Sequence, residues 1–191
     1  MAEPDHLARI WLTYKTRIIS EQRFNNYALV SHLALSWYAF LSIVFSIYQS
    51  NLAKSLGEVG ANQASLVISV LTFGLSLVIY GFKFEDAART HRDCYLRMQS
   101  IYQSDDSNER KLEDYRKLLD HYPNHASRDY SDLLFDGWRS GRVLKGTDGL
   151  PIKFSNSDAA VCYARRVLWI VFIAIVFGLP PVLGVYWASG K

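Results

Sequence analysis

The amino-acid sequence predicts an all-α integral membrane protein. It should have two core transmembrane helices with cytoplasmic helical extensions, and a third, C-terminal transmembrane helix. The first observation is composition, because half of the 191 residues are hydrophobic although 20% are charged. The second is segregation, because Asp, Glu, Lys and Arg are absent from three windows, 24–53, 59–82 and 167–190. Each window exceeds the roughly 20 residues that a helix needs to cross the hydrocarbon of a bilayer.

We place the three membrane spans at 28–49, 64–83 and 167–187. The first span begins too deep in the chain, and is too long, to be a cleavable signal peptide. Trp169 and Trp187 stand near the two ends of the third span, as interfacial anchors do. The other segments are expected to be a cytoplasmic amphipathic helix at 1–27, an extracytoplasmic loop at 50–63, a cytoplasmic helical hairpin and loop region at 84–166, and an extracytoplasmic tail at 188–191.

The distribution of Lys and Arg predicts the orientation of the chain. Of the 21 such residues, four lie in 1–27 and fifteen in 83–166, whereas the loop holds only Lys54 and the tail only Lys191. Cytoplasmic segments of membrane proteins carry the excess of Lys and Arg. We therefore expect the N-terminus and the hairpin region inside the cell, and the loop and the C-terminus outside.

The charged region 83–166 is close to neutral overall, with fifteen basic and fourteen acidic residues. This balance weighs against direct binding of nucleic acid, which favours a basic surface. The basic residues Arg139, Arg142 and Lys145 suit either a solvated loop or contact with a phosphate or lipid headgroup.

No motif predicts an enzyme, a cofactor or a metal site. No Gly-Lys-Ser/Thr follows a glycine at the spacing of a phosphate-binding loop. His121 and His125, near Asp120 and Asp129, have a metal-like spacing. Pro123 stands between the two histidines and should break the helix that would align them, which favours helix-end capping and turn contacts instead.

A seam of apolar or small residues follows the second span, with spacings of four and three residues. It consists of Phe84, Ala88, His91, Tyr95, Met98 and Tyr102. Such spacing is typical of helices that pack along a coiled-coil seam. The seam could pair within one chain or also hold subunits of a homo-oligomer together.

Two helices joined by a turn are expected over 84–122. Asp106 and Glu109 form a plausible capping box for the second helix, and Pro123 disfavours helix in the residue before it. No proline separates the second span from the seam, so a continuous helix is expected from Thr72 to Tyr102. The N-terminal segment has a stripe that should pack on this hairpin, namely Leu7, Trp11, Tyr14 and Ile18.

Polar groups mark one face of the second span and part of the first. The face of the second span comprises Ser65, Ser69, Thr72, Ser76, Tyr80 and Lys83, and the first span contributes Ser31, His32, Ser42 and Ser46. Two interpretations remain open. Small hydroxylated residues allow close helix packing in lipid, and they can also line a water-filled path between several subunits.

The third span carries Pro180 and Pro181 in the stretch "FGLPPVLG". Each proline lacks a backbone N–H and leaves a carbonyl of the preceding turn without its helical donor. Backbone groups in hydrocarbon must find protein partners. We therefore expect this part of the span to be kinked or loosened and to pack against a neighbouring helix.

The chain resembles the SLATT family, small membrane effectors of bacterial conflict systems. The matching stretches are "YKTRIISEQRFNNY" at 14–27, "GFKFEDAARTHRDCY" at 81–95 and "YRKLLDHYPNHASRDY" at 115–130. With the first two spans they cover roughly residues 10–135. The third span, 167–187, departs from the minimal two-helix pattern of the family, so the resemblance assigns it no role.

The resemblance implies a pore-forming effector of the bacterial inner membrane that acts in antiphage defence of the abortive-infection type. It also implies a partner encoded nearby: a cytoplasmic sensor, a nucleotide-signal protein or a reverse transcriptase. The alternative is a passive membrane anchor or scaffold that recruits a cytoplasmic partner, and a membrane-embedded enzyme is a third. The polar face of the second span favours the effector, because a scaffold does not need such a face.

The orientation leads to a first testable prediction. Alkaline phosphatase fused after Lys191 should be active in cells, because this enzyme folds only outside the cytoplasm and the C-terminus is expected there. A fusion within 84–166 should be inactive. Activity of a cytoplasmic reporter at Lys191 would remove the third span from the topology.

Overall fold

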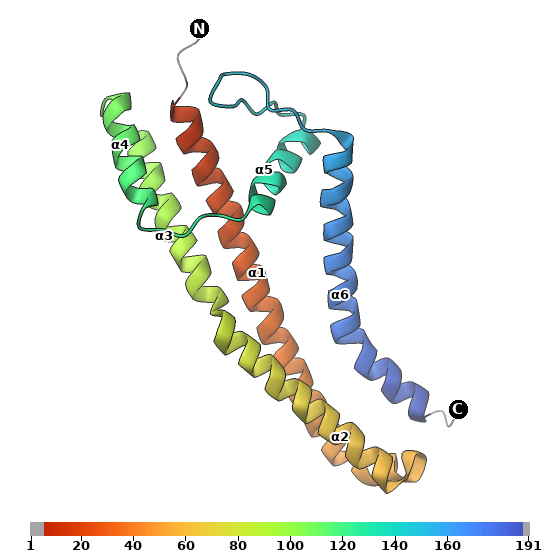
Figure 1. Ribbon diagram of the computed structural model, residues 1–191. Coiled ribbons are helices and arrows are strands. Elements are labelled where there is room, and N and C mark those ends of the chain that lie inside the picture. The colour runs from red at the N-terminus through yellow and green to blue at the C-terminus, as the bar shows by residue number, and fades with distance from the viewer. Residues whose placement is uncertain (1–5, 189–191) are drawn as a thin grey trace. The chain divides into compact units, whose positions relative to one another are not determined.

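The computed structural model describes residues 6–188, with side chains at 7–54 and 57–182. Its helices, labelled in Figure 1, are α1 (His6–Ile47), α2 (Gln49–Phe82), α3 (Phe84–Gln103), α4 (Asn108–Leu119), α5 (Ser127–Arg139) and α6 (Asn156–Ala188). Three of these helices have the length and apolarity needed to cross a membrane. The predicted all-α membrane fold is therefore confirmed. The side chain of Trp187, the proposed anchor, and the end of the predicted tail lie outside the described parts.

The chain divides into two units whose borders follow the distribution of charge. The polar unit consists of residues 1–25 and 85–166, and the membrane unit of 26–84 and 167–191. The membrane unit thus takes nearly all of the three charge-free windows. Two helices, α1 and α6, continue from one unit into the other as single helices.

In the polar unit, α3 and α4 form the expected hairpin and pack with the first turns of α1. The core of this packing is Ile10 of α1, Cys94 and Met98 of α3, and Tyr115 of α4, each at most 3% exposed. The Lys111 amine also donates to the carbonyl of Tyr102 across the turn, at 3.3 Å. The hairpin is held by contacts within one chain.

The seam on α3 is largely occupied inside this unit. Ala88, His91 and Met98 are buried, and the Tyr102 ring lies 6.2 Å from that of Tyr14. These positions make contacts within one chain, and their role in holding subunits together stays a prediction. Of the N-terminal stripe, Tyr14 packs on this core while other stripe residues are half-buried. The residues of this part of α1 that are fully buried are Ile10, Thr16, Arg17 and Ser20, none of which belongs to the predicted stripe.

The start of α4 differs from the predicted capping box. Ser107, not Asp106, is the N-cap, and its hydroxyl accepts from the backbone N–H of Arg110 at 3.4 Å. Asp106 contacts the Arg110 side chain instead. At the other end α4 stops at Leu119, three residues before the expected position. The reason is that the 120–122 backbone closes in tight turns that precede Pro123.

A capping box that the sequence analysis missed starts α6. The Ser155 hydroxyl accepts from the N–H of Asp158 at 3.2 Å, and the Asp158 carboxylate accepts from the N–H of Ser155 at 3.0 Å. These reciprocal bonds satisfy two donors at the helix end. The third span is therefore the continuation of a helix that begins eleven residues earlier, in the polar unit.

In the membrane unit, α2 returns beside the second half of α1 (Figure 1). The segment 50–63, predicted to be a loop, is helical, because α2 begins at Gln49 directly after Tyr48. Only Gly57 has non-helical angles within it, with φ 73° and ψ 158°, a conformation that glycine adopts without a steric penalty. The segment contains residues with high helix propensity, such as Leu52, Ala53 and Lys54.

The continuous helix expected from Thr72 to Tyr102 is broken. Lys83 adopts the left-handed conformation, with φ 43° and ψ 48°, and ends α2 before α3 begins at Phe84. The rings of Phe82 and Phe84 stack across this break at 5.5 Å. The left-handed C-cap, usually glycine, falls here on a lysine whose charge suits a helix C-terminus. The prediction of one unbroken helix from the second span through the seam is therefore wrong.

Candidate functional site

A buried ionic cluster lies at the centre of the polar unit. Asp129 of α5 is fully buried and faces α1. Its carboxylate accepts from the Ser20 hydroxyl at 2.6 Å and from Nη2 of Arg23 at 2.9 Å, while Nε of Arg23 lies 2.7 Å from Oδ1. One carboxylate thus ties α5 to two positions on α1 that are three residues apart.

Arg17 is the second buried guanidinium of this cluster, one turn before Ser20 on α1. Its Nη1 donates to the carbonyl of Pro123 at 2.9 Å. Within the described part of the chain its Nε and Nη2 are buried without a hydrogen-bond partner. The arginine therefore holds the connection between α4 and α5. Its two unpaired donor groups offset part of the stability that this contact contributes.

Two histidines lie near the two arginines and stay neutral. Burial, assisted by the Arg17 guanidinium, lowers the pKa of His91 to about 4, and the ring stacks on that of Phe24 at 5.5 Å. Burial followed by Arg17 also lowers the pKa of His125. Since unfolded histidine titrates near 6.5, the stability that neutral His91 contributes is lost as the pH falls from about 6.5 to about 4.

His121 and His125, the two residues with metal-like spacing, lie in different surroundings. The His121 ring contacts the carbonyl of Lys117 at 2.8 Å, at the end of α4, whereas His125 lies in the ionic cluster. Among the described residues no group of three His, Cys, Asp or Glu could hold a metal ion. The predicted helix-end contact is thus present for His121.

Helix α5 also contacts the first turns of α6. Phe135 is fully buried against Ala159 and Cys162, and the Arg166 guanidinium lies 4.4 Å from its ring centre. Arg165 and Arg166 pair with Asp132 and Asp136 of α5. Helix α5 therefore connects α1 and α6, the two helices that continue into the membrane unit.

In the membrane unit, a tyrosine compensates for a proline. Pro180 has no N–H, so the carbonyl of Val176 lacks its helical donor. The hydroxyl of Tyr38 on α1 donates to this carbonyl at 3.0 Å. Tyr38 is buried with Leu41 and Ile68, and Val176 packs against this cluster. The predicted partner for the proline segment is therefore confirmed.

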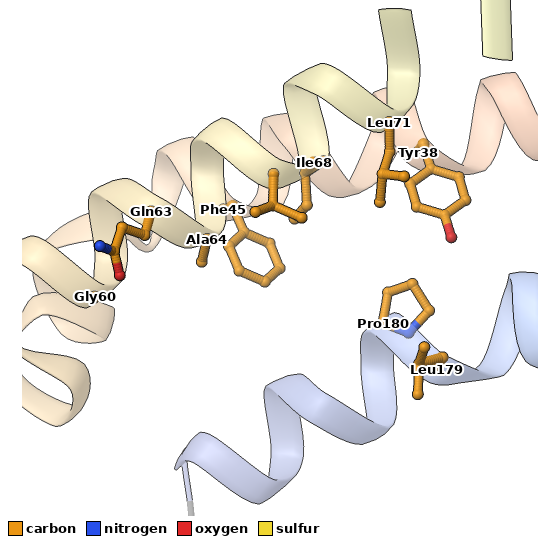
Figure 2. Close-up of a pocket in the computed structure, with 10 residues that line it drawn as sticks. Tyr38, Phe45, Gly60, Gln63, Ala64, Ile68, Leu71, Leu179 and Pro180 are labelled. Atoms are coloured by element: carbon orange, nitrogen blue, oxygen red, sulfur yellow. The ribbon is translucent and has the colours of Figure 1, made fainter. Parts of the chain in front are cut away.

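A cavity of about 540 Å³ lies between α1, α2 and α6, next to this contact (Figure 2). Its wall includes Tyr38 and Phe45 of α1, Leu179 and Pro180 of α6, and residues of α2. The α2 residues are Gly60, Gln63, Ala64, Val67, Ile68 and Leu71. Figure 2 shows Gln63 at one end and Tyr38 at the other, with Pro180 facing α2 across the space.

The hydroxyl face of α2 lies away from this cavity. None of its six residues is in the cavity wall, and Tyr80 is 79% exposed. Lys83 and Ser69 are also exposed, whereas Ser65, Thr72 and Ser76 are half-buried. The hydroxyls of Ser69, Thr72 and Ser76 donate to carbonyls of α2 itself, at 2.7–2.9 Å.

The polar residues of the first span do not form a single site. The Ser42 hydroxyl donates to the carbonyl of Tyr38 at 3.0 Å. Ser31 is half-buried, and His32 and Ser46 are exposed. These side chains do not line the cavity either. The polar residues predicted from the sequence are thus exposed or half-buried and lie outside the cavity, and neither the cavity nor the ionic cluster was predicted.

Comparison with known protein families identifies a match over most of the chain. The model of the family described as "SMODS and SLOG-associating 2TM effector domain family 5" matches residues 3–187. The match includes the third span, which the resemblance seen in the sequence had left outside. No curated protein and no solved structure matches the chain.

The ionic cluster leads to a stability prediction. Asp129→Asn keeps the shape of the side chain but leaves the Arg23 guanidinium without its counter-charge. Removing one partner of a buried ion pair costs about 3–5 kcal/mol, so the free energy of unfolding should fall by about 3 kcal/mol. Urea unfolding of the purified full-length chain in detergent measures this change, and limited proteolysis should show faster cleavage around α5.

Asp136→Asn is the matched control, because its pair with Arg166 is largely exposed. Exposed pairs contribute about 0–1 kcal/mol. An equal fall in the free energy of unfolding of the two variants would show that the buried ion pair of Asp129 contributes no more to stability than the exposed pair of Asp136.

The contact between Tyr38 and Val176 can be isolated by a double-mutant cycle. Tyr38→Phe should cost about 1 kcal/mol, within the range measured for hydrogen bonds between membrane helices. In a Pro180→Ala background the same change should cost almost nothing, because alanine at this position returns a helical N–H to the carbonyl of Val176. Unfolding in detergent by increasing dodecyl sulfate measures both.

Tyr80→Phe is the control for loss of a tyrosine hydroxyl, since this side chain is exposed. If Tyr38→Phe lowered the free energy of unfolding equally in the unmodified chain and in the Pro180→Ala background, the cycle would show no coupling between the two positions. Tyr38 would then not compensate for the proline.

Proposed function

The chain belongs to the SMODS and SLOG-associating 2TM effector domain family, and from this membership we propose that it is an oligomeric effector that permeabilises the inner membrane in bacterial antiphage defence. In this proposal the N-terminus lies in the cytoplasm, and the protein acts by opening a path rather than by catalysis. Infected cells would stop growing when the membrane is breached.

The observation that carries the proposal is the hydroxyl face of α2, on which Ser69, Tyr80 and Lys83 are exposed. In the membrane unit this face is turned away from the cavity and from the buried α1–α2 contacts of Ile68. A hydroxyl that donates to its own helix still has acceptor lone pairs. The face therefore presents a row of hydrogen-bond acceptors. Water in a path can donate to these acceptors, whereas lipid tails cannot.

Several copies are needed to enclose a path. The membrane unit of one chain buries few of its apolar residues, and Leu66, Val70, Phe73 and Leu77 of α2 are each more than half exposed. Lipid or further helices can cover this apolar surface, whereas the hydroxyl face gains most from other hydroxyl faces or from water. We therefore place α2 at the subunit contacts, with its hydroxyls towards the axis.

The trigger would act through α5. This helix holds α1 by Asp129 and α6 by Phe135, Asp132 and Asp136. Helices α1 and α6 continue into the membrane unit, whereas the connection between α2 and α3 is interrupted at Lys83. A change in the position of α5 would therefore act on the membrane unit through α1 and α6. A cytoplasmic sensor, a nucleotide-signal protein or a reverse transcriptase encoded nearby is the proposed partner.

The hydroxyl face can be tested by paired substitutions. Ser69→Leu with Ser76→Leu should reduce release of a small dye from cells expressing the protein by about tenfold, because an apolar constriction dewets a narrow path. Leucine is favourable in a membrane helix, so the span should still insert. Dye release and the mass of the detergent-solubilised oligomer are measured together.

Val70→Ser with Leu77→Ser is the matched control on the exposed apolar side of α2, and dye release should stay close to that of the unmodified chain. Loss of dye release with an intact oligomer supports the path. Loss of both would assign the face to helix packing, and full dye release with an intact oligomer would exclude it as the path. No release by any form of the chain would favour a passive scaffold.

A further inference from the structure

We propose that the cavity between α1, α2 and α6 is a binding site for an acyl chain of a membrane phospholipid. The site lies on a different side of α2 from the hydroxyl face. It therefore assigns the membrane unit a lipid ligand that does not depend on the permeation path.

Water does not suit this cavity. A buried water needs two to four polar partners, and among the side chains in the wall only those of Tyr38 and Gln63 are polar. The Tyr38 proton is already committed to the carbonyl of Val176. An empty space of about 540 Å³ would in turn deprive Phe45, Ile68 and Leu71 of the dispersion contacts that a filled site supplies.

The dimensions suit a lipid chain better than a helix of a second copy. A helix with its side chains is about 10 Å across, so about 7 Å of its length would fill the cavity, which is little more than one turn. An extended acyl chain is about 4.5 Å across, judged from carbon–carbon contact distances of about 4 Å, and spans half of a 30 Å bilayer. Such a chain occupies about 250 Å³ and fits with room for the side chains to move.

The polarity of the two ends orients the chain. Gln63 lies at one end of the cavity (Figure 2), only five residues after Glu58, the last charged residue before the span. This end is therefore the one near the headgroups. The Gln63 amide has two N–H donors, which suit the ester carbonyls of a phospholipid. The tail then reaches past Ala64 and Ile68 towards Tyr38 and Pro180.

Pro180 gives the site its far wall. The helix α6 reaches the cavity at Leu179 and Pro180, next to the carbonyl that Tyr38 satisfies. A bound tail contacts all three membrane helices at this end and fills the space that α6 leaves beside α2. Ring and methylene contacts of this kind are individually small and collectively substantial.

The experiment uses the full-length chain in vesicles of phosphatidylethanolamine and phosphatidylglycerol. A phosphatidylcholine with a diazirine at the end of one acyl chain is the probe, and mass spectrometry locates the adducts after illumination. Adducts should concentrate around Tyr38, Leu71 and Pro180. An even spread over lipid-exposed positions such as Leu66 and Phe73 would overturn the proposal.

Val67→Trp fills the cavity from a side chain that is 56% exposed, and Val70→Trp places the same ring on α2 outside the cavity wall. The first change should lower the adduct yield at Tyr38 and Pro180 several-fold, and the second should leave it unchanged. Leu71→Trp is a second filling variant if Val67→Trp fails to insert. Unchanged yields with both filling variants would overturn the proposal.

Gln63→Leu tests the polar end. It should lower the yield with the phospholipid probe but not with a diazirine-bearing alkane, which has no ester. A smaller oligomer for Val67→Trp, with adducts unchanged, would assign the cavity to a contact between copies and overturn the lipid site. Dye release is not a readout here, so the lipid site and the proposed path fail separately.

Discussion

A polypeptide inside hydrocarbon has to pair its own amide and carbonyl groups, because lipid tails offer no partner. The membrane unit follows from this constraint. The α1 and α2 helices meet at Tyr48 with almost no loop, and the only non-helical angles within α2 fall on Gly57. Where the prolines of α6 remove donors, the Tyr38 hydroxyl replaces one of them. Hydroxyls on α2 bond to their own helix for the same reason.

The polar unit obeys a complementary constraint, because a buried charge must be compensated. Asp129 is compensated by Ser20 and Arg23, and Arg17 holds the segment that leads to α5. These bonds hold α5 against α1, and α5 also contacts the start of α6 around Phe135. The polar unit is therefore organised around α5, which contacts both α1 and α6, the two helices that continue into the membrane unit.

Packing of the helices separates two surfaces of α2. Close packing of Ala61, Ala64 and Ile68 directs one side of α2 towards its neighbours, which leaves the hydroxyls on another side. The prolines place α6 across from α2, where the cavity lies. The hydroxyl face and the cavity therefore lie on different sides of α2, and our two proposals assign them different partners: water or other subunits to the face, and a lipid tail to the cavity.

The predictions from the sequence succeeded where the physics is local. The spans, the α3–α4 hairpin and the need of the Pro180 segment for a partner depend on composition, spacing and proline chemistry. The loop at 50–63 was wrong because small polar residues are compatible with both a loop and a helix that must satisfy its backbone near lipid. The continuous helix was wrong because nothing in residues 72–102 marks Lys83 as a left-handed cap.

By itself the sequence determined that the chain is a helical membrane protein, since apolar windows of more than about 20 residues are the length that a membrane-spanning helix needs. It also determined the polar face of α2, which depends only on helical periodicity. Only the tertiary structure decided that Arg17 and Ser20, polar residues that a periodicity argument places at the surface, lie buried around Asp129. It alone decided that Tyr38 meets Val176 and that a cavity opens beside them. Such contacts join residues more than a hundred positions apart, and their energies exist only when the helices are packed.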